Sequence, residues 1–217
     1  KPQLKKNSII GLLGGNGLGK STLLKILNHD IKLDLKSETI KKLLKGNEIY
    51  SFLQQDSEVA YKPQDVLSLS KIKRTVARIV SKFDKKIIDD FDLRKIMNRK
   101  LCECSGGELQ RLAIATVMNK KREAYFFDEP SAFLDIKQRI KASNHITSLS
   151  SLEKYILCVD HDLTVLDLLS DYIMCFYGES NGYGVISSLQ STYNGINNYL
   201  DGYLKNENVR FRDHSIS

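Results

Sequence analysis

A glycine-rich loop near the N-terminal end lies between an apolar stretch and a stretch of helix-forming residues. The apolar stretch is Ser8–Leu13, the loop reads Gly-Gly-Asn-Gly-Leu-Gly-Lys-Ser over residues 14–21, and leucines follow at Leu23, Leu24 and Leu27. A short apolar run bounded by glycines favours a buried strand, and the spacing of the leucines favours a helix. We therefore expect a strand, a tight loop and a helix in succession.

Similar apolar pieces recur in the second half of the chain. Apolar runs at Ala124–Phe127, Tyr155–Val159 and Tyr172–Tyr177 alternate with helix-like segments over 136–149 and 163–169. Strands that alternate with helices favour a mostly parallel sheet covered by helices on both faces. The expected fold class is therefore α/β.

Residues 65–122 have a helical character throughout. One helical stripe predicts a helix over 70–83, and a second is expected soon after it; the apolar residues are Ile72, Val76, Ile79, Val80 and Phe83, then Ile87, Ile88 and Phe91. This block is expected to form a helical subdomain.

Residues 29–61 are harder to assign. Ile40, Leu43 and Leu44 suggest a short amphipathic helix that breaks near Gly46.

Composition sets limits on the class of protein. With 217 residues, 41% of them hydrophobic, the chain can bury an ordinary core without disulfides or metals. No apolar run approaches the roughly 20 residues that span a bilayer, and no signal peptide is expected at Lys1–Asn7, which is charged and polar. The expected location is cytoplasmic and no membrane is expected among the partners, although composition alone leaves a membrane partner possible.

The four cysteines are too scattered for a disulfide framework and lack C-x-x-C spacing, so reduced thiols are expected. Cys102 and Cys104 could supply two metal ligands, but no second pair stands near them.

The glycine loop matches the pattern G-x-x-x-x-G-K-[ST], with a predicted strand before it and a predicted helix after it. Successive backbone N–H groups of such a loop cradle phosphates at a helix N-terminus, Lys20 supplies a charge to the β- and γ-phosphates, and Ser21 ligates Mg²⁺. The alternative is a plain glycine-rich turn. The predicted nucleotide-binding residues of the loop are Gly14, Gly15, Asn16, Gly17, Leu18, Gly19, Lys20, Ser21 and Thr22.

The apolar strand that begins at Ala124 ends in two carboxylates, Asp128 and Glu129. Parallel sheets present their ligands at the carboxyl ends of their strands. Asp128 is suited to hold Mg²⁺, and Glu129 to orient or deprotonate an attacking water. Alone, such a pair is ordinary surface chemistry; together with the glycine loop it favours catalysis.

A third motif is Ser105-Gly106-Gly107-Glu108-Leu109-Gln110. Glycines at a helix start leave the N-terminal N–H groups unscreened for a phosphate. Ser105 and Glu108 also fit a capping box, which is the structural alternative, although a capping box does not need the two glycines.

These motifs resemble those of the ABC ATPases. The order of the glycine loop, Ser-Gly-Gly-Glu-Leu-Gln-Arg from Ser105 (signature motif) and Asp128-Glu129 matches that family, as do Gln64 (Q-loop), Ser131–Asp135 (D-loop) and His161 (switch histidine). The resemblance implies a P-loop NTPase fold of the ABC type that binds ATP and Mg²⁺. It implies catalytic roles for Lys20, Gln64, Glu129 and His161, and metal contacts from Ser21, Gln64 and Asp128. Ser105, Gly106, Gly107 and Asp135 would then serve an ATP bound by a partner module.

Further segments resemble the RNase L inhibitor proteins, the ribosome-recycling subfamily. They are Leu134–Arg139, Asp162–Asp167, Tyr183–Val185, Gly195–Tyr203 and Glu207–Arg212. The resemblance implies one nucleotide-binding domain over 1–217, with a helical signature subdomain at about 65–122 and a hinge-like segment at about 191–217. The family's cysteine-rich iron–sulfur domain and its second nucleotide-binding domain have no counterpart in the sequence, so the iron–sulfur clusters are not expected in this chain.

The resemblance implies a mechanical switch driven by ATP, whose partners are a second nucleotide-binding domain, the small ribosomal subunit and release or initiation factors. Two alternatives stay open: a nucleotide-binding module with negligible turnover without its other half, and the cytosolic ATPase subunit of a membrane transporter. The net charge of +7 would suit an RNA-rich partner, but charged clusters are usually solvated helix faces.

Overall fold

The computed structural model describes residues 3–33, 37, 48–55, 57–213 and 215. The short helix expected around Ile40–Leu44 lies outside these residues.

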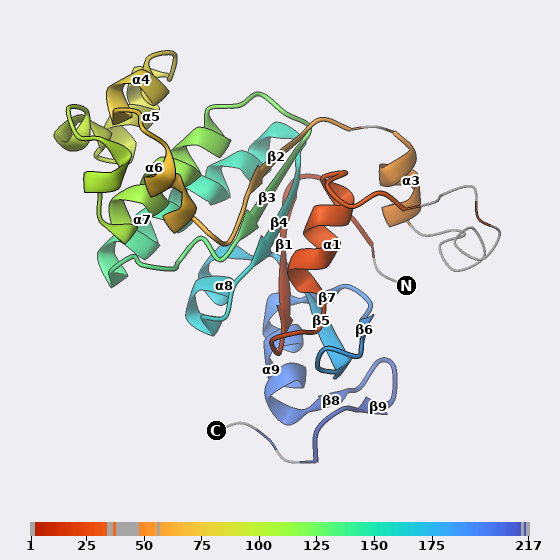
Figure 1. Ribbon diagram of the computed structural model, residues 1–217. Helices are drawn as coiled ribbons and strands as arrows, with labels where there is room; N and C mark the ends of the chain where they lie inside the picture. The colour runs from red at the N-terminus through yellow and green to blue at the C-terminus, as the bar shows by residue number, and fades with distance from the viewer. Residues whose placement is uncertain (1–2, 34–36, 38–47, 56, 214, 216–217) are drawn as a thin grey trace.

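A central sheet organises the molecule (Figure 1). The strand order is β2-β3-β4-β1-β5-β6, with β7 also paired to β5. The strands β2, β3, β4, β1 and β5 run parallel, whereas β6 and β7 are antiparallel to β5. Their bounds are β1 Ser8–Gly14, β2 Val59–Lys62, β3 Ala124–Asp128, β4 Tyr155–Val159, β5 Tyr172–Glu179, β6 Tyr183–Ile186 and β7 Gln190–Ser191. The predicted α/β class with a mostly parallel sheet is confirmed.

The strands are apolar on both faces because helices cover both. In β3, Tyr125 and Phe127 face one core cluster and Phe126 faces the other, as the two-residue repeat of a strand requires. One face packs against α1 (Lys20–Leu27) and α3 (Glu48–Gln54). The other packs against α6 (Gly106–Met118) and α7 (Ile136–Thr147), which continues as the 3-10 turn η4 (Ser148–Leu152). Figure 1 shows the two layers on either side of the sheet.

The part of the chain between β2 and β3 forms a helical lobe to the left in Figure 1. The elements before α6 are short: η1 Leu67–Lys71, α4 Val76–Val80, α5 Lys85–Asp90, η2 Leu93–Ile96 and η3 Leu101–Glu103.

The single helix predicted over 70–83 is wrong. Ile72 is extended, with φ −82° and ψ 116°, and Thr75 forms a β-bridge with Lys100. This long-range pairing uses backbone groups that a continuous helix would need, because each backbone N–H and C=O must find a partner. The apolar stripe is therefore divided between η1, the bridge and α4.

Elements towards the C-terminus pack on β1 and β5 of the sheet. They comprise α8 (Leu163–Leu169), α9 (Thr192–Asp201) and the hairpin of β8 (Tyr203–Leu204) and β9 (Val209–Arg210). After β9, the Phe211 ring stacks between Tyr177 of β5 and Tyr199 of α9, with centroid separations of 5.8 and 6.1 Å. Among the described residues, no helix combines the length and the apolar character that crossing a bilayer demands.

Candidate functional site

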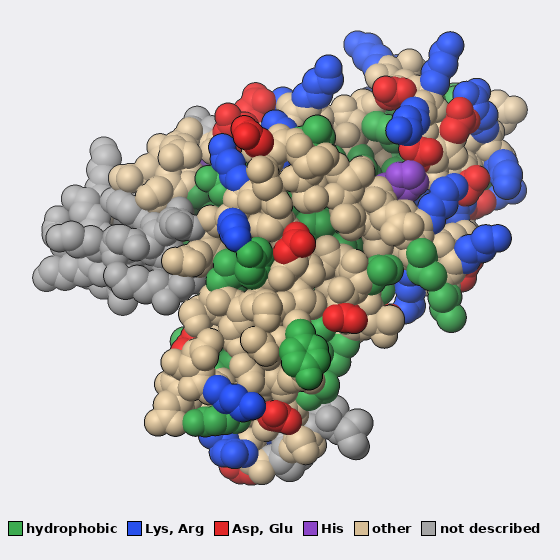
Figure 2. Space-filling view, turned by 180° about the vertical axis from the view of Figure 1, so that it is seen from behind, with side chains coloured by type: hydrophobic (Ala, Val, Ile, Leu, Met, Phe, Trp, Pro, Cys, Tyr) green, Lys and Arg blue, Asp and Glu red, His purple; other side chains and the backbone are tan. Residues whose placement is uncertain are grey.

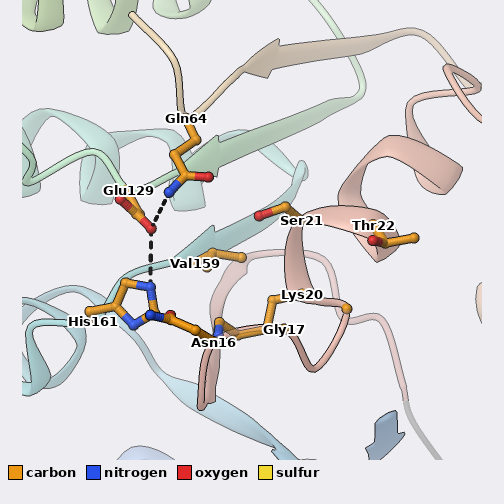
Figure 3. Close-up of a pocket in the computed structure, with 10 residues that line it drawn as sticks. Asn16, Gly17, Lys20, Ser21, Thr22, Gln64, Glu129, Val159 and His161 are labelled. Carbon is orange, nitrogen blue, oxygen red and sulfur yellow. Dashed lines mark hydrogen bonds and ion pairs between the residues drawn. The ribbon is translucent and has the colours of Figure 1, made fainter. Parts of the chain in front are cut away.

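Residues of the glycine loop, Gln64, Glu129 and His161 meet at the carboxyl ends of the parallel strands. A cavity of about 250 Å³ opens there beside the N-terminus of α1 (Figure 3). The topology accounts for this, because the loops after β1, β2, β3 and β4 all leave the same edge of a parallel sheet. The lining residues are Asn16, Gly17, Gly19, Lys20, Ser21, Thr22, Gln64, Glu129, Val159 and His161. Gly14, Gly15 and Leu18 of the predicted set belong to the loop without lining this cavity.

The glycine loop bends through left-handed backbone conformations. Gly17 has φ 75° and Gly19 has φ 90°, values that residues with a Cβ adopt rarely. Gly19 is the N-cap of α1 and supplies no side-chain cap, so the first N–H groups of the helix remain available to an anion. A Cβ on Gly19 would meet no heavy atom within 4 Å, so it is the backbone conformation that selects glycine here.

The Lys20 ammonium lies folded onto the loop. Its Nζ donates to the carbonyl oxygens of Gly14 and Gly15, each at 2.7 Å. Burial lowers the pKa of Lys20, while the carboxylates of Glu129 and Asp128 oppose that shift. The lysine ammonium is thus held beside the cavity by two neutral carbonyl acceptors.

Asp128 ends β3 and is 1% exposed. The Tyr61 hydroxyl donates to its Oδ2 at 3.2 Å, whereas its buried Oδ1 accepts no hydrogen bond among the described residues. Burial raises the pKa of Asp128, against the opposing effects of Ser21 and Tyr61. A buried carboxylate oxygen with no donor, next to a serine hydroxyl, is the environment that a hard cation such as Mg²⁺ satisfies. These residues therefore fit the predicted metal.

Glu129 reaches the cavity from the end of the same strand. Its Oε1 accepts a hydrogen bond from Gln64 Nε2 at 2.8 Å and lies 3.0 Å from His161 Nε2. Figure 3 shows the three side chains converging, with Ser21 across the cavity. The structure thus brings together four residues that lie far apart in the sequence.

Two buried side chains behind Glu129 were not predicted. Lys62 donates to the carbonyls of Asp128 (2.7 Å) and Glu129 (3.0 Å), and Gln110 Nε2 donates to that of Glu129 at 2.7 Å. Burial lowers the pKa of Lys62 to about 8. In the sequence, Lys62 could have been found as a lysine that ends an apolar strand two residues before Gln64. Gln110 could have been found only through its place in the signature motif.

A hairpin supports the glycine loop from outside the cavity. The turn between β5 and β6 contacts it through Ser180 Oγ, which donates to the Asn16 carbonyl at 2.8 Å, and Asn181 N–H, which donates to that of Gly17 at 3.1 Å. A Cβ on Gly184 of β6 would lie 2.1 Å from the Leu18 carbonyl oxygen. The β6 backbone therefore packs directly against the loop, a contact that sequence patterns did not indicate.

The signature residues lie outside the cavity. Ser105 caps α6, accepting from Glu108 N–H at 3.3 Å while Glu108 accepts from Ser105 N–H at 2.8 Å, so the capping box is formed. A Cβ on Gly107 would lie 2.9 Å from the Phe133 carbonyl oxygen, and one on Gly106 would lie 3.1 Å from the Phe133 ring. The D-loop therefore packs on the signature glycines, and close approach is a second reason for glycine there.

Asp135 caps α7, accepting from Gln138 N–H at 2.8 Å. It too is absent from the cavity lining.

The basic groups of the helical lobe are interspersed with acidic ones, as Figure 2 shows over the upper right of the molecule. Arg94 pairs with Asp89, Arg99 with Glu108 and Lys141 with Asp92. Exposed pairs of this kind are typical of solvated helix faces. These pairs neutralise only some of the basic groups, so the surface stays basic overall, in keeping with the net charge of +7.

Comparisons with known proteins agree with this geometry. The family model described as "ABC transporter" matches residues 1–132. Translation initiation factor RLI1 of Chaetomium thermophilum is 40% identical over 236 residues, which cover 100% of this chain and 39% of that protein. The chain thus spans about two fifths of the length of this relative.

Two solved structures are also similar. A crystal structure of the archaeal ribosome recycling factor aABCE1 with the ribosomal stalk protein aP1 has a TM-score of 0.90 and 38% identity, covering 99% of this chain and 44% of that one. A structure named RNase-L Inhibitor has the same TM-score and identity, covering 99% of this chain and 45% of that one. Proteins of the matched family are generally ATPases that bind nucleotide and Mg²⁺. The chain belongs to the ABC transporter family, and within it the chain is similar to the RNase L inhibitor proteins.

Proposed function

We propose that this chain binds Mg-ATP in the cavity beside α1 and hydrolyses it when a second ABC module completes the site. The observation that carries the proposal is the convergence of Lys20, Ser21, Gln64, Glu129 and His161 on one cavity, with the donor-free oxygen of Asp128 behind it. Phosphoryl transfer needs mainly positioning and charge stabilisation, which such a set can supply.

Each side chain has a role that its place supports. Lys20 would exchange its bonds to the Gly14 and Gly15 carbonyls for bonds to the β- and γ-phosphates. Mg²⁺, when bound by Ser21, Gln64 and Asp128, would neutralise charge on the phosphate oxygens. Glu129 would orient the attacking water and accept its proton, and His161 would contact the γ-phosphate.

The remaining motif residues would act on a partner's nucleotide. Ser105, Gly106, Gly107 and Asp135 do not line the cavity of their own chain, so each module would hold half of two composite sites. Two modules closing around ATP would then convert binding into domain movement, and hydrolysis would release it.

The relatives suggest where that movement is used. One is named a translation initiation factor, and another is a ribosome recycling factor solved with a ribosomal stalk protein. We therefore place this chain in a cytoplasmic switch that separates ribosomal subunits, with the small subunit and release or initiation factors as partners. The rival, a transporter subunit, predicts co-sedimentation with membranes; co-sedimentation with ribosomal particles would exclude it.

Calorimetry tests the binding step. Wild-type chain should take up ATP only with Mg²⁺, and Lys20→Ala should weaken that uptake at least about 100-fold, because a charged phosphate contact is lost. Lys25→Ala, on the exposed side of the same helix, is the control and should stay within about twofold of wild type. Magnesium-independent uptake, or uptake that survives in Lys20→Ala, would contradict the proposal.

Mixing experiments test turnover. ATPase activity should appear when the chain is mixed with a second ABC module from a relative. Glu129→Gln should lower it at least about 100-fold while Mg-ATP binding persists. Glu123→Gln, an exposed carboxylate just before β3, should leave the rate unchanged. Binding without turnover in any mixture would instead favour the alternative of a nucleotide-binding module that does not hydrolyse ATP.

A further inference from the structure

The backbone of Glu129 adopts a conformation that residues with a Cβ avoid. Its φ is 51°, in the left-handed region, where the Cβ crowds the following carbonyl oxygen. Such a conformation persists only where the surroundings hold it. The residue lies at the turn where β3 ends and the D-loop begins, and its side chain meets Gln64 and His161 at the cavity wall.

The contacts that hold this backbone come from three elements. The Glu129 N–H donates to the Val159 carbonyl of β4 at 2.8 Å. Its carbonyl oxygen accepts from Gln110 Nε2 of α6 at 2.7 Å and from Lys62 Nζ of β2 at 3.0 Å. Lys62 also binds the preceding carbonyl, that of Asp128, at 2.7 Å. The peptide unit after Glu129 is therefore fixed from two directions.

Neither of the two donors, Lys62 and Gln110, is a surface side chain. Lys62 and Gln110 are each 0% exposed, and burying a lysine or glutamine is costly unless specific partners compensate. Lys62 occupies a core position paired with Phe127 in the sheet, which an apolar side chain could fill. Both side chains instead converge on one carbonyl oxygen next to the cavity.

We propose, on the basis of the function proposed above, that Lys62 and Gln110 are positioning residues that clamp the Glu129 carbonyl and so aim its carboxylate into the cavity. Lys62 anchors the turn to the strand that leads into Gln64. Gln110 anchors it to the helix that Ser105 caps. The clamp thus joins the Q-loop strand, the signature helix and the candidate catalytic carboxylate.

The first test needs no nucleotide. Lys62→Met and Gln110→Met each remove a donor at similar length. Amide hydrogen exchange followed by NMR should show the Glu129 N–H exchanging at least about tenfold faster in each variant than in wild type. Amides of the β1–β4 pairing, such as Leu157, should keep wild-type rates. The controls Lys82→Met and Gln54→Met, both exposed, should change neither set.

The second test separates positioning from binding. In the mixture with a second module, both variants should lower kcat at least about tenfold while KM and the calorimetric Kd for Mg-ATP stay within about threefold, because the phosphate loop is untouched. A purely structural role would instead accelerate exchange throughout the sheet and weaken binding as well.

Failure of the clamp and failure of the proposed function give different results. Wild-type exchange at Glu129 in both variants overturns the clamp, as does acceleration that is uniform across the sheet. If Lys62→Met does not fold, Gln110→Met decides alone. If wild-type chain takes up no Mg-ATP, the proposed function fails, whereas the exchange comparison still decides whether the clamp exists.

Discussion

Lys62 shows how one residue combines a cost in stability with a role at the site. Its ammonium is fully buried, with backbone carbonyls as hydrogen-bond acceptors and the carboxylates of Asp128, Glu129 and Asp160 near enough to raise its pKa. Burial is nevertheless the largest effect and lowers the pKa from 10.5 to about 8. The folded state therefore binds this proton less tightly than the unfolded chain does.

This shift predicts how stability depends on pH. Below pH 8 Lys62 is charged in both states, so its burial penalty is fully present. Between pH 8 and 10.5 the unfolded chain keeps a proton that the folded chain releases, so the free energy of unfolding rises with pH. Between pH 7 and pH 10, the free energy of unfolding of wild type should therefore rise by roughly 2 kcal/mol more than that of Lys62→Met, which lacks the titrating group.

Urea unfolding in magnesium-free buffer at the two pH values measures this difference. The ionisation of buried Cys175 cancels in the comparison, because both proteins contain it and Lys62 does not contribute to its raised pKa. Because Lys62 lowers the pKa of the Cys158 thiol, both proteins carry Cys158→Ala in this measurement. Lys82→Met, at an exposed lysine, should show no such gain relative to wild type. If the free energy of unfolding of wild type, relative to that of Lys62→Met, falls or stays constant as the pH rises, the lowered pKa of Lys62 is refuted.

At the level of elements, the β5–β6 hairpin supports the glycine loop that the sequence motif defines. Ser180 and Asn181 bond its carbonyls, and Gly184 allows the β6 backbone to approach Leu18. The loop's shape thus depends on residues more than 160 positions away in the sequence, as the separation of Ser180 from Asn16 shows. Such support preorganises a binding loop, which favours affinity because less ordering is left for the ligand to impose.

Gly184→Ala should therefore disturb the loop. Its Cβ would lie 2.1 Å from a backbone oxygen that cannot rotate away, so we expect a loss of about 1–3 kcal/mol in stability and weaker Mg-ATP binding by about tenfold or more. Thermal unfolding and calorimetry measure the two effects. Gly182→Ala, in the same hairpin, meets its nearest atoms at 3.4 Å and should bind as wild type does. Equal affinities in the two variants would show that the hairpin does not shape the loop.

At the level of the whole molecule, the predicted motifs divide between two places. The glycine loop, Gln64, Glu129 and His161 line one cavity. Ser105 of the signature motif and Asp135 of the D-loop instead cap helices elsewhere. Among the described residues of this chain, the contacts of the signature motif and Asp135 are structural: Ser105 and Asp135 cap helices, and the signature glycines pack against Phe133. We propose that this group acts on nucleotide only against a second module.

Ser105→Ala tests this division. Loss of the N-cap should cost about 1 kcal/mol of stability, while the affinity of this chain for Mg-ATP should be unchanged, because Ser105 does not line its cavity. Activity in the mixture with a second module should fall about tenfold or more. Ser191→Ala is a matched control, since Ser191 is the N-cap of α9 without a side-chain cap bond. Reduced ATP affinity in the isolated Ser105→Ala chain would contradict the two-module arrangement.

The sequence alone determined the order of the main strands and helices and the residues of the glycine loop. Both are local properties of the chain. Apolar runs indicate β1, β3 and β4, and the glycine pattern indicates a loop in which Gly17 and Gly19 adopt left-handed conformations. Gln64, Glu129 and His161 were predicted from motifs, and the topology explains why they meet, since parallel strands end at one edge.

Only the tertiary structure decided the features that depend on distant partners. The bridge of Thr75 to Lys100 interrupts a stripe that reads as one helix, and no local pattern shows that Lys62 and Gln110 meet at the Glu129 carbonyl. Periodicity tells which side of an element is buried but not which atom lies opposite. The partner of a buried donor is set by how elements far apart in the chain pack together, and that packing is a property of the whole fold.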